Sequence, residues 1–88
     1  GLSRHLSENF PGSTIILFGS YSFGEDTQDS DIDIAIIGAK RKGIETGKFE
    51  EYLERRISVN FYNSLADINK NLRENILNGI VLSGGITL

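Results

Sequence analysis

The 88-residue sequence contains no cysteine, which excludes disulfides and metal centres built on thiolates. The absence of disulfides fits a cytoplasmic protein, and we expect that location. No apolar run approaches the ~20 residues of a membrane-spanning helix, and no signal-peptide pattern opens the sequence, so we predict no membrane association. Methionine is also absent, even at position 1, so we expect the sequence to be part of a longer chain.

The formal net charge of −3 argues against a nucleic-acid groove as the main function of the surface, and we consider a nucleic-acid partner unlikely. The charges are unevenly distributed. Five of the twelve acidic residues lie between positions 25 and 33, namely Glu25, Asp26, Asp29, Asp31 and Asp33. The basic run 40–42 follows and is interpreted as a solvated loop.

Hydrophobic periodicity predicts alternating strands and helices. We expect helices over 2–9, 43–56 and 64–78 and strands over 13–20, 31–38, 57–63 and 80–88, the last at an edge of the sheet. The length suits one domain, 1–88. We therefore predict an α/β (α+β) fold in which helices pack on a small mixed β-sheet. The aromatic residues are expected in its core: Phe10, Phe18, Phe49, Tyr52, Phe61 and Tyr62.

Two carboxylates stand inside one of the apolar strands. In 31–38, alternation places Ile32, Ile34 and Ile36 on one face and both Asp31 and Asp33 on the other. Ten residues earlier, Gly19-Ser20 ends a strand where a helix is expected, and a glycine turn at a helix N-terminus attracts phosphate. Oxygen ligands beside such a turn suit Mg²⁺, and the pattern indicates metal-assisted phosphoryl or nucleotidyl transfer.

The pattern of Gly19-Ser20, ten residues, then Asp31-x-Asp33 resembles the signature of the DNA polymerase β-like nucleotidyltransferases, in particular their minimal nucleotidyltransferase (MNT) subgroup. The resemblance implies the nucleotidyltransferase fold. It also implies that Gly19 and Ser20 bind the triphosphate of ATP, with Gly24 matching a further common glycine. Asp31 and Asp33 would then be the catalytic residues that bind Mg²⁺.

The sequence departs from the family at one catalytic position. Relatives carry a third carboxylate on the strand after the second helix, and Asn60 occupies the matching place. By resemblance we predict an adenylyltransferase that moves AMP from ATP onto a hydroxyl. Its expected acceptor is a helical HEPN-type toxin, which would make this chain an antitoxin. The alternative is a weakened or inactive module that neutralises its partner by binding alone.

Overall fold

The structure, a computed structural model, describes residues 1–19 and 31–85 of the chain. These residues form a four-stranded sheet in the order β3-β2-β1-β4. The strands are β1 (Thr14–Phe18), β2 (Ile32–Ile37), β3 (Ile57–Tyr62) and β4 (Ile80–Ser83). β1 pairs antiparallel with both β2 and β4, whereas β2 and β3 run parallel. The mixed sheet is as predicted, and its last strand lies at an edge.

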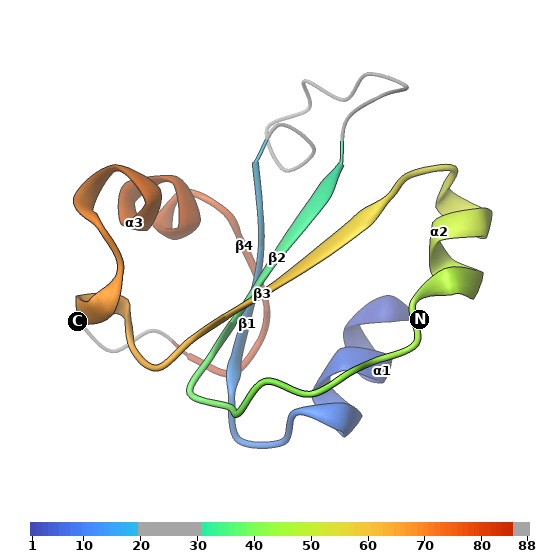
Figure 1. Ribbon diagram of the computed structural model, residues 1–88, viewed down its shortest axis with the longest axis horizontal. Coiled ribbons are helices and arrows are strands. Elements are labelled where there is room, and N and C mark those ends of the chain that lie inside the picture. The colour runs from blue at the N-terminus through green and yellow to red at the C-terminus, as the bar shows by residue number, and fades with distance from the viewer. Residues whose placement is uncertain (20–30, 86–88) are drawn as a thin grey trace.

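Helices cover both faces of this sheet (Figure 1). One face packs against α1 (Leu2–Asn9) and α2 (Gly47–Leu53) through a cluster of buried residues: Leu6, Phe10, Ile15, Ile32, Ile34, Ile36 and Ile57. The other face packs against α3 (Lys70–Leu77) through Ile16, Phe18, Ala35, Ile68 and Ile76. Because β1 is covered on both faces, its sequence is apolar on both, as expected for a buried strand.

Two helices are shorter than predicted. The segment 40–46 has no regular secondary structure, and α2 begins only at Gly47 and ends where Glu54 adopts a left-handed conformation with φ of 55°. The helix predicted over 64–78 is also broken. A 3₁₀ turn, η1 (Leu65–Asp67), is followed by extended Ile68, and the Asn69 side chain accepts a bond from the Leu72 amide to start α3.

The prediction that Tyr52 belongs to the core is wrong, since 86% of its surface is exposed. On α2, Phe49 and Leu53 pack against the core. Tyr52 precedes Leu53 by one residue, which turns it by about 100° around the helix and away from the sheet. Phe10 and Phe18 are buried, and Phe49, Phe61 and Tyr62 are partly buried.

Candidate functional site

Gly19 lies directly against the carboxylate of Asp33. β1 ends at Phe18, which pairs with Asp33 across the antiparallel ladder, and Gly19 follows with φ of +86°. A Cβ atom placed on Gly19 would stand 2.6 Å from Asp33 Oδ2. Both the left-handed torsion and the close approach require glycine here. Gly19, the residue after β1, is therefore brought into contact with the acidic strand.

The two aspartates of this strand are close enough to influence each other. Asp31 is exposed just before β2, and Asp33 is partly buried within it. Burial raises the pKa of the Asp33 carboxyl above its usual value, and the negative charge of Asp31 raises it further. The charge of Asp31 thus disfavours the ionised form of Asp33, and a cation placed between the two carboxylates would offset that penalty.

Asp33 shares its face of the sheet with polar residues of the neighbouring strand. In the parallel register, Asp33 is paired with Ser58 and Ala35 with Asn60. Since Ala35 belongs to the cluster under α3 and alternate residues share a face, Ser58 and Asn60 lie on the same face as Asp33. Asn60 thus stands two residue pairs further along the strands than Asp33, on the same face of the sheet.

The amide group of Asn60 is engaged in hydrogen bonds. Its nitrogen donates to the carbonyl oxygen of Ile34 at 3.2 Å, and to the carbonyl and hydroxyl oxygens of Ser58, each at 3.4 Å. A carboxylate cannot donate such bonds. Asn60 therefore ties β3 to β2 beside the aspartates, which an aspartate at this position could not do in its ionised form.

Tyr62 is a neighbour of this site that sequence reasoning placed only in the core. It follows Asn60 by two residues and packs against the cluster under α3. Burial raises the pKa of the Tyr62 hydroxyl, and the negative charge of Asp33 raises it further. The signal was present in the sequence, since the alternation that put Asn60 beside Asp33 puts Tyr62 on the same face.

The carboxylates of Asp31 and Asp33 suit a divalent cation that is also coordinated by a bound phosphate ligand. Among residues 1–19 and 31–85, no group of three or more His, Cys, Asp or Glu side chains is gathered as a complete metal site. Two neighbouring carboxylates are nevertheless the usual protein contribution to a Mg²⁺ ion, whose remaining ligands are phosphate oxygens and water. Asp31 and Asp33 would hold such an ion. Ser20 and Gly24, also predicted here, lie outside the described residues.

Comparison with known proteins agrees with this architecture. Residues 1–83 match the family described as nucleotidyltransferase domain. No curated protein matches the chain. Among solved structures, a toxin–antitoxin crystallised with AMP-PNP is similar at 27% identity and a TM-score of 0.67, covering 96% of this chain and 71% of that one. A mutant of the MntA–HpeT toxin–antitoxin is similar in fold, at 24% identity and a TM-score of 0.64, with 96% and 70% covered. In the part of the chain that the structure describes, no helix has the length and apolar character needed to cross a membrane.

Proposed function

We propose that this chain, which belongs to the nucleotidyltransferase domain family, binds ATP with Mg²⁺ and transfers AMP to a hydroxyl group of a partner protein. The observation that carries the proposal is the contact between Gly19 and Asp33, with no room for a Cβ atom between them. It brings a glycine turn suited to phosphate and a carboxylate suited to a metal ion to one place. Metal-assisted phosphoryl transfer uses a metal ion next to the bound phosphate.

Each described residue of the site has a distinct task in this proposal. Gly19 lets the backbone after β1 approach the triphosphate closely. Asp31 and Asp33 hold Mg²⁺, which when bound neutralises phosphate charge and polarises the phosphoryl oxygens. The hydroxyl oxygen of the acceptor attacks the α-phosphorus, pyrophosphate leaves, and the hydroxyl proton passes to water, because Asn60 at the third family position cannot act as a base.

The proposed partner is a toxin of the HEPN type, and the chain would act as its antitoxin. Support comes from the similar toxin–antitoxin crystallised with AMP-PNP, a non-hydrolysable ATP analogue. It also comes from the resemblance of the Gly19-Ser20 and Asp31-x-Asp33 pattern to the MNT subgroup. We expect the acceptor to be a side-chain hydroxyl of that toxin.

The test is a transfer assay with ATP labelled at the α-phosphate, Mg²⁺ and the product of the neighbouring gene. We expect label on the partner with the parent chain and none with Asp33→Asn. Asp67→Asn is the matched control, because Asp67 is an exposed aspartate of η1, outside the site. Equal labelling by Asp33→Asn and Asp67→Asn would contradict the proposal.

A second candidate function is neutralisation of the partner by binding alone. The hydrogen bonds of Asn60 favour it, since the amide at the family's third carboxylate position is used to join β3 to β2. An amide cannot act as a base at neutral pH. This candidate predicts a stable complex in which the partner carries no label. It also predicts that Asp33→Asn does not weaken the complex, and the two results together would favour it over AMP transfer.

A further inference from the structure

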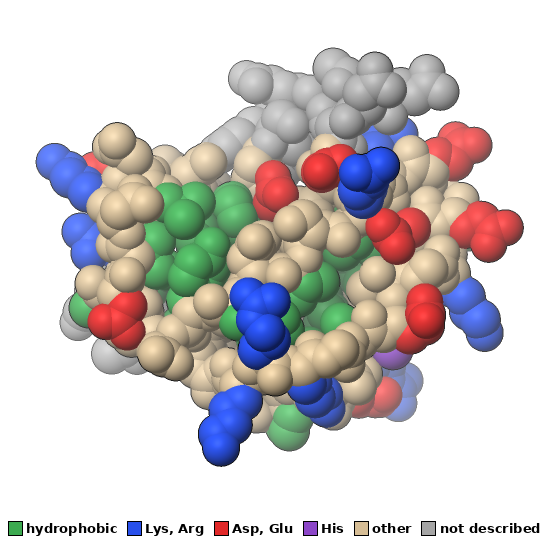
Figure 2. All heavy atoms as spheres, in the orientation of Figure 1, with side chains coloured by type: hydrophobic (Ala, Val, Ile, Leu, Met, Phe, Trp, Pro, Cys, Tyr) green, Lys and Arg blue, Asp and Glu red, His purple; other side chains and the backbone are tan. Residues whose placement is uncertain are grey.

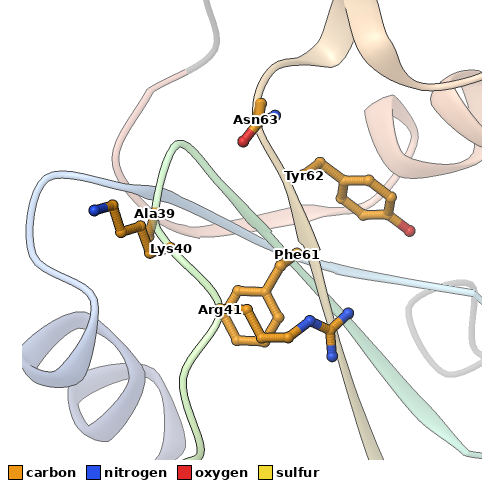
Figure 3. A pocket seen from close by; sticks show the side chains of 6 residues that line it. All are labelled: Ala39, Lys40, Arg41, Phe61, Tyr62 and Asn63. Atoms are coloured by element: carbon orange, nitrogen blue, oxygen red, sulfur yellow. The ribbon is translucent and has the colours of Figure 1, made fainter.

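A hollow opens at the end of the sheet opposite to the aspartates, where the parallel strands β2 and β3 finish (Figure 3). Its volume is about 340 Å³, and it is lined by Ala39, Lys40, Arg41, Phe61, Tyr62 and Asn63. The segment after β2 is tied down here, because the Gly38 amide donates to the Tyr62 carbonyl oxygen at 2.9 Å. Crevices outside the carboxyl ends of parallel strands are common ligand sites.

Arg41, which lines the hollow, and Lys42, which follows it in the chain, both lie over aromatic rings. The Arg41 guanidinium carbon lies 5.2 Å from the centre of the Phe61 ring, and the Lys42 ammonium lies 5.4 Å from the centre of the Phe10 ring. Lys40 points in the opposite direction from Arg41 (Figure 3). Figure 2 shows Lys and Arg side chains gathered over the lower middle of the face, with hydrophobic atoms visible between them.

These three positive charges are exposed and unneutralised within the described residues. Lys40, Arg41 and Lys42 all face solvent, and the one ion pair found in the described part of the chain joins Arg4 to Glu8. The Arg41 side chain is exposed, so the N–H donors that lie in the plane of its guanidinium are available to a carboxylate. Contact with the Phe61 ring also restricts the Arg41 side chain before any ligand arrives, which lowers the entropy cost of binding.

We propose that this hollow, with the cations of residues 40–42, binds an acidic segment of a partner protein. Charge complementarity is the first argument, since residues 40–42 are three adjacent cations in a chain whose net charge is −3. The second argument separates an acidic peptide from a nucleic acid. Single-stranded nucleic acids bind by stacking bases on aromatic rings, and Phe61 and Phe10 already have Arg41 and Lys42 over them.

The position of the hollow gives the proposal a consequence for the whole molecule. It lies beyond Ile37, the last residue of β2, whereas Asp33 lies near the start of that strand. An acidic segment bound at residues 40–42 therefore lies at the other end of β2 from Asp31 and Asp33. The interaction requires neither nucleotide nor metal, so it stands whether or not the chain transfers AMP.

The experiment uses a fluorescein-labelled eight-residue peptide of alternating Asp and Glu, titrated with the metal-free chain and followed by fluorescence anisotropy. We expect binding that weakens with salt, because exposed charges are screened. Arg41→Gln should weaken it about fivefold to tenfold, since a bidentate charged contact is lost. Arg41→Lys keeps the charge without the planar fork and should recover only part of the loss. Lys70→Gln removes an exposed cation of α3 and should change the affinity less than twofold.

Two competitors decide the class of ligand. An eight-nucleotide single-stranded RNA carries comparable charge and should bind less tightly than the peptide, and inorganic phosphate should compete poorly. Amide chemical shifts should move with the peptide at residues 39–42 and 61–63. Tighter binding of the RNA, equal binding by Arg41→Gln and Lys70→Gln, shifts located elsewhere, or no binding of the peptide would each overturn the proposal.

Discussion

Replacing Gly19 by alanine tests the central contact of the site. Gly19 has φ of +86°, and the added Cβ atom would lie 2.6 Å from Asp33 Oδ2. The next atoms of Asp33 stand at 3.5 and 3.6 Å, which is ordinary contact. The carboxylate group alone must therefore move, by about 0.8 Å to reach contact at 3.4 Å. Such a movement turns the metal-binding oxygen without disturbing β2.

The effect on stability and the effect on binding can be separated. A non-glycine residue in the left-handed region costs about 1–2 kcal/mol, and alanine recovers about 0.4–1 kcal/mol of that by restricting the unfolded chain. We expect a net loss of roughly 1 kcal/mol, or about 4–8 °C in Tm for a domain of this size. Displacement of Asp33 should lower the affinity for Mg²⁺ and ATP by about tenfold or more, as for other groups that orient metal ligands.

Gly12→Ala is the matched control. Gly12 has a nearly equal φ of +79°, and no atom lies within 4 Å of the Cβ that would be added there. Both variants should lose similar stability in thermal unfolding. In calorimetric titration with Mg²⁺ and a non-hydrolysable ATP analogue, only Gly19→Ala should bind more weakly. If the two variants bind equally well, the contact of Gly19 with Asp33 does not shape the binding site.

Three further predictions concern charge, capping and the third family position. Burial and Asp31 raise the pKa of Asp33, so the folded chain holds this proton more tightly than the unfolded chain, and stability falls as pH rises through the raised pKa. Asp33→Asn should therefore stabilise the metal-free protein at neutral pH. At a pH below 3.8, the ordinary pKa of an aspartate, it should give no such gain. Denaturant midpoints measured at both pH values test this. Asn69→Ala removes the bond to the Leu72 amide and should cost about 1 kcal/mol in thermal unfolding, with unchanged nucleotide affinity. Asn60→Asp replaces the donor to the Ile34 carbonyl oxygen by a further charge and should destabilise the metal-free protein by about 1–3 kcal/mol. In the transfer assay it should label the partner faster, because a general base contributes about 10²–10⁴ in rate; no gain would mean that Asn60 is not the missing base.

The strands could be predicted from the sequence because each of them obeys one simple rule. β1 is apolar on both faces since α1 and α3 cover opposite sides of it. β2 alternates isoleucine with aspartate, and a period of two can place Asp33 on one face only. Both patterns follow from which side chains are buried, and the order of apolar and polar residues along a strand shows this directly.

The helices were harder to predict because their ends depend on single contacts. Leu65, Ile68, Leu72 and Ile76 form one apolar stripe in the sequence, yet the Asn69 cap starts a new helix within it. The apolar spacing continues across the break, because the residues before and after it pack against the same core. Hydrophobic periodicity therefore cannot show where one helix ends and the next begins. Likewise, the length of α2 is set by the left-handed Glu54, a torsion that its residue type does not announce.

Asn60 shows how a family pattern and a local structure can lead to different expectations. By resemblance, its place belongs to a carboxylate, so the sequence alone indicates a loss. In the structure the amide donates to Ile34 and Ser58, so the residue also supplies a join between strands that an ionised carboxylate could not make. A third negative charge would add to the repulsion that already raises the pKa of Asp33. The asparagine therefore favours a site that is stable before metal binds, at the expense of the base that transfer needs. Partner binding should therefore depend little on metal, whereas AMP transfer should depend on it strongly. Measuring both at increasing Mg²⁺ concentration distinguishes an adenylyltransferase from a binding module.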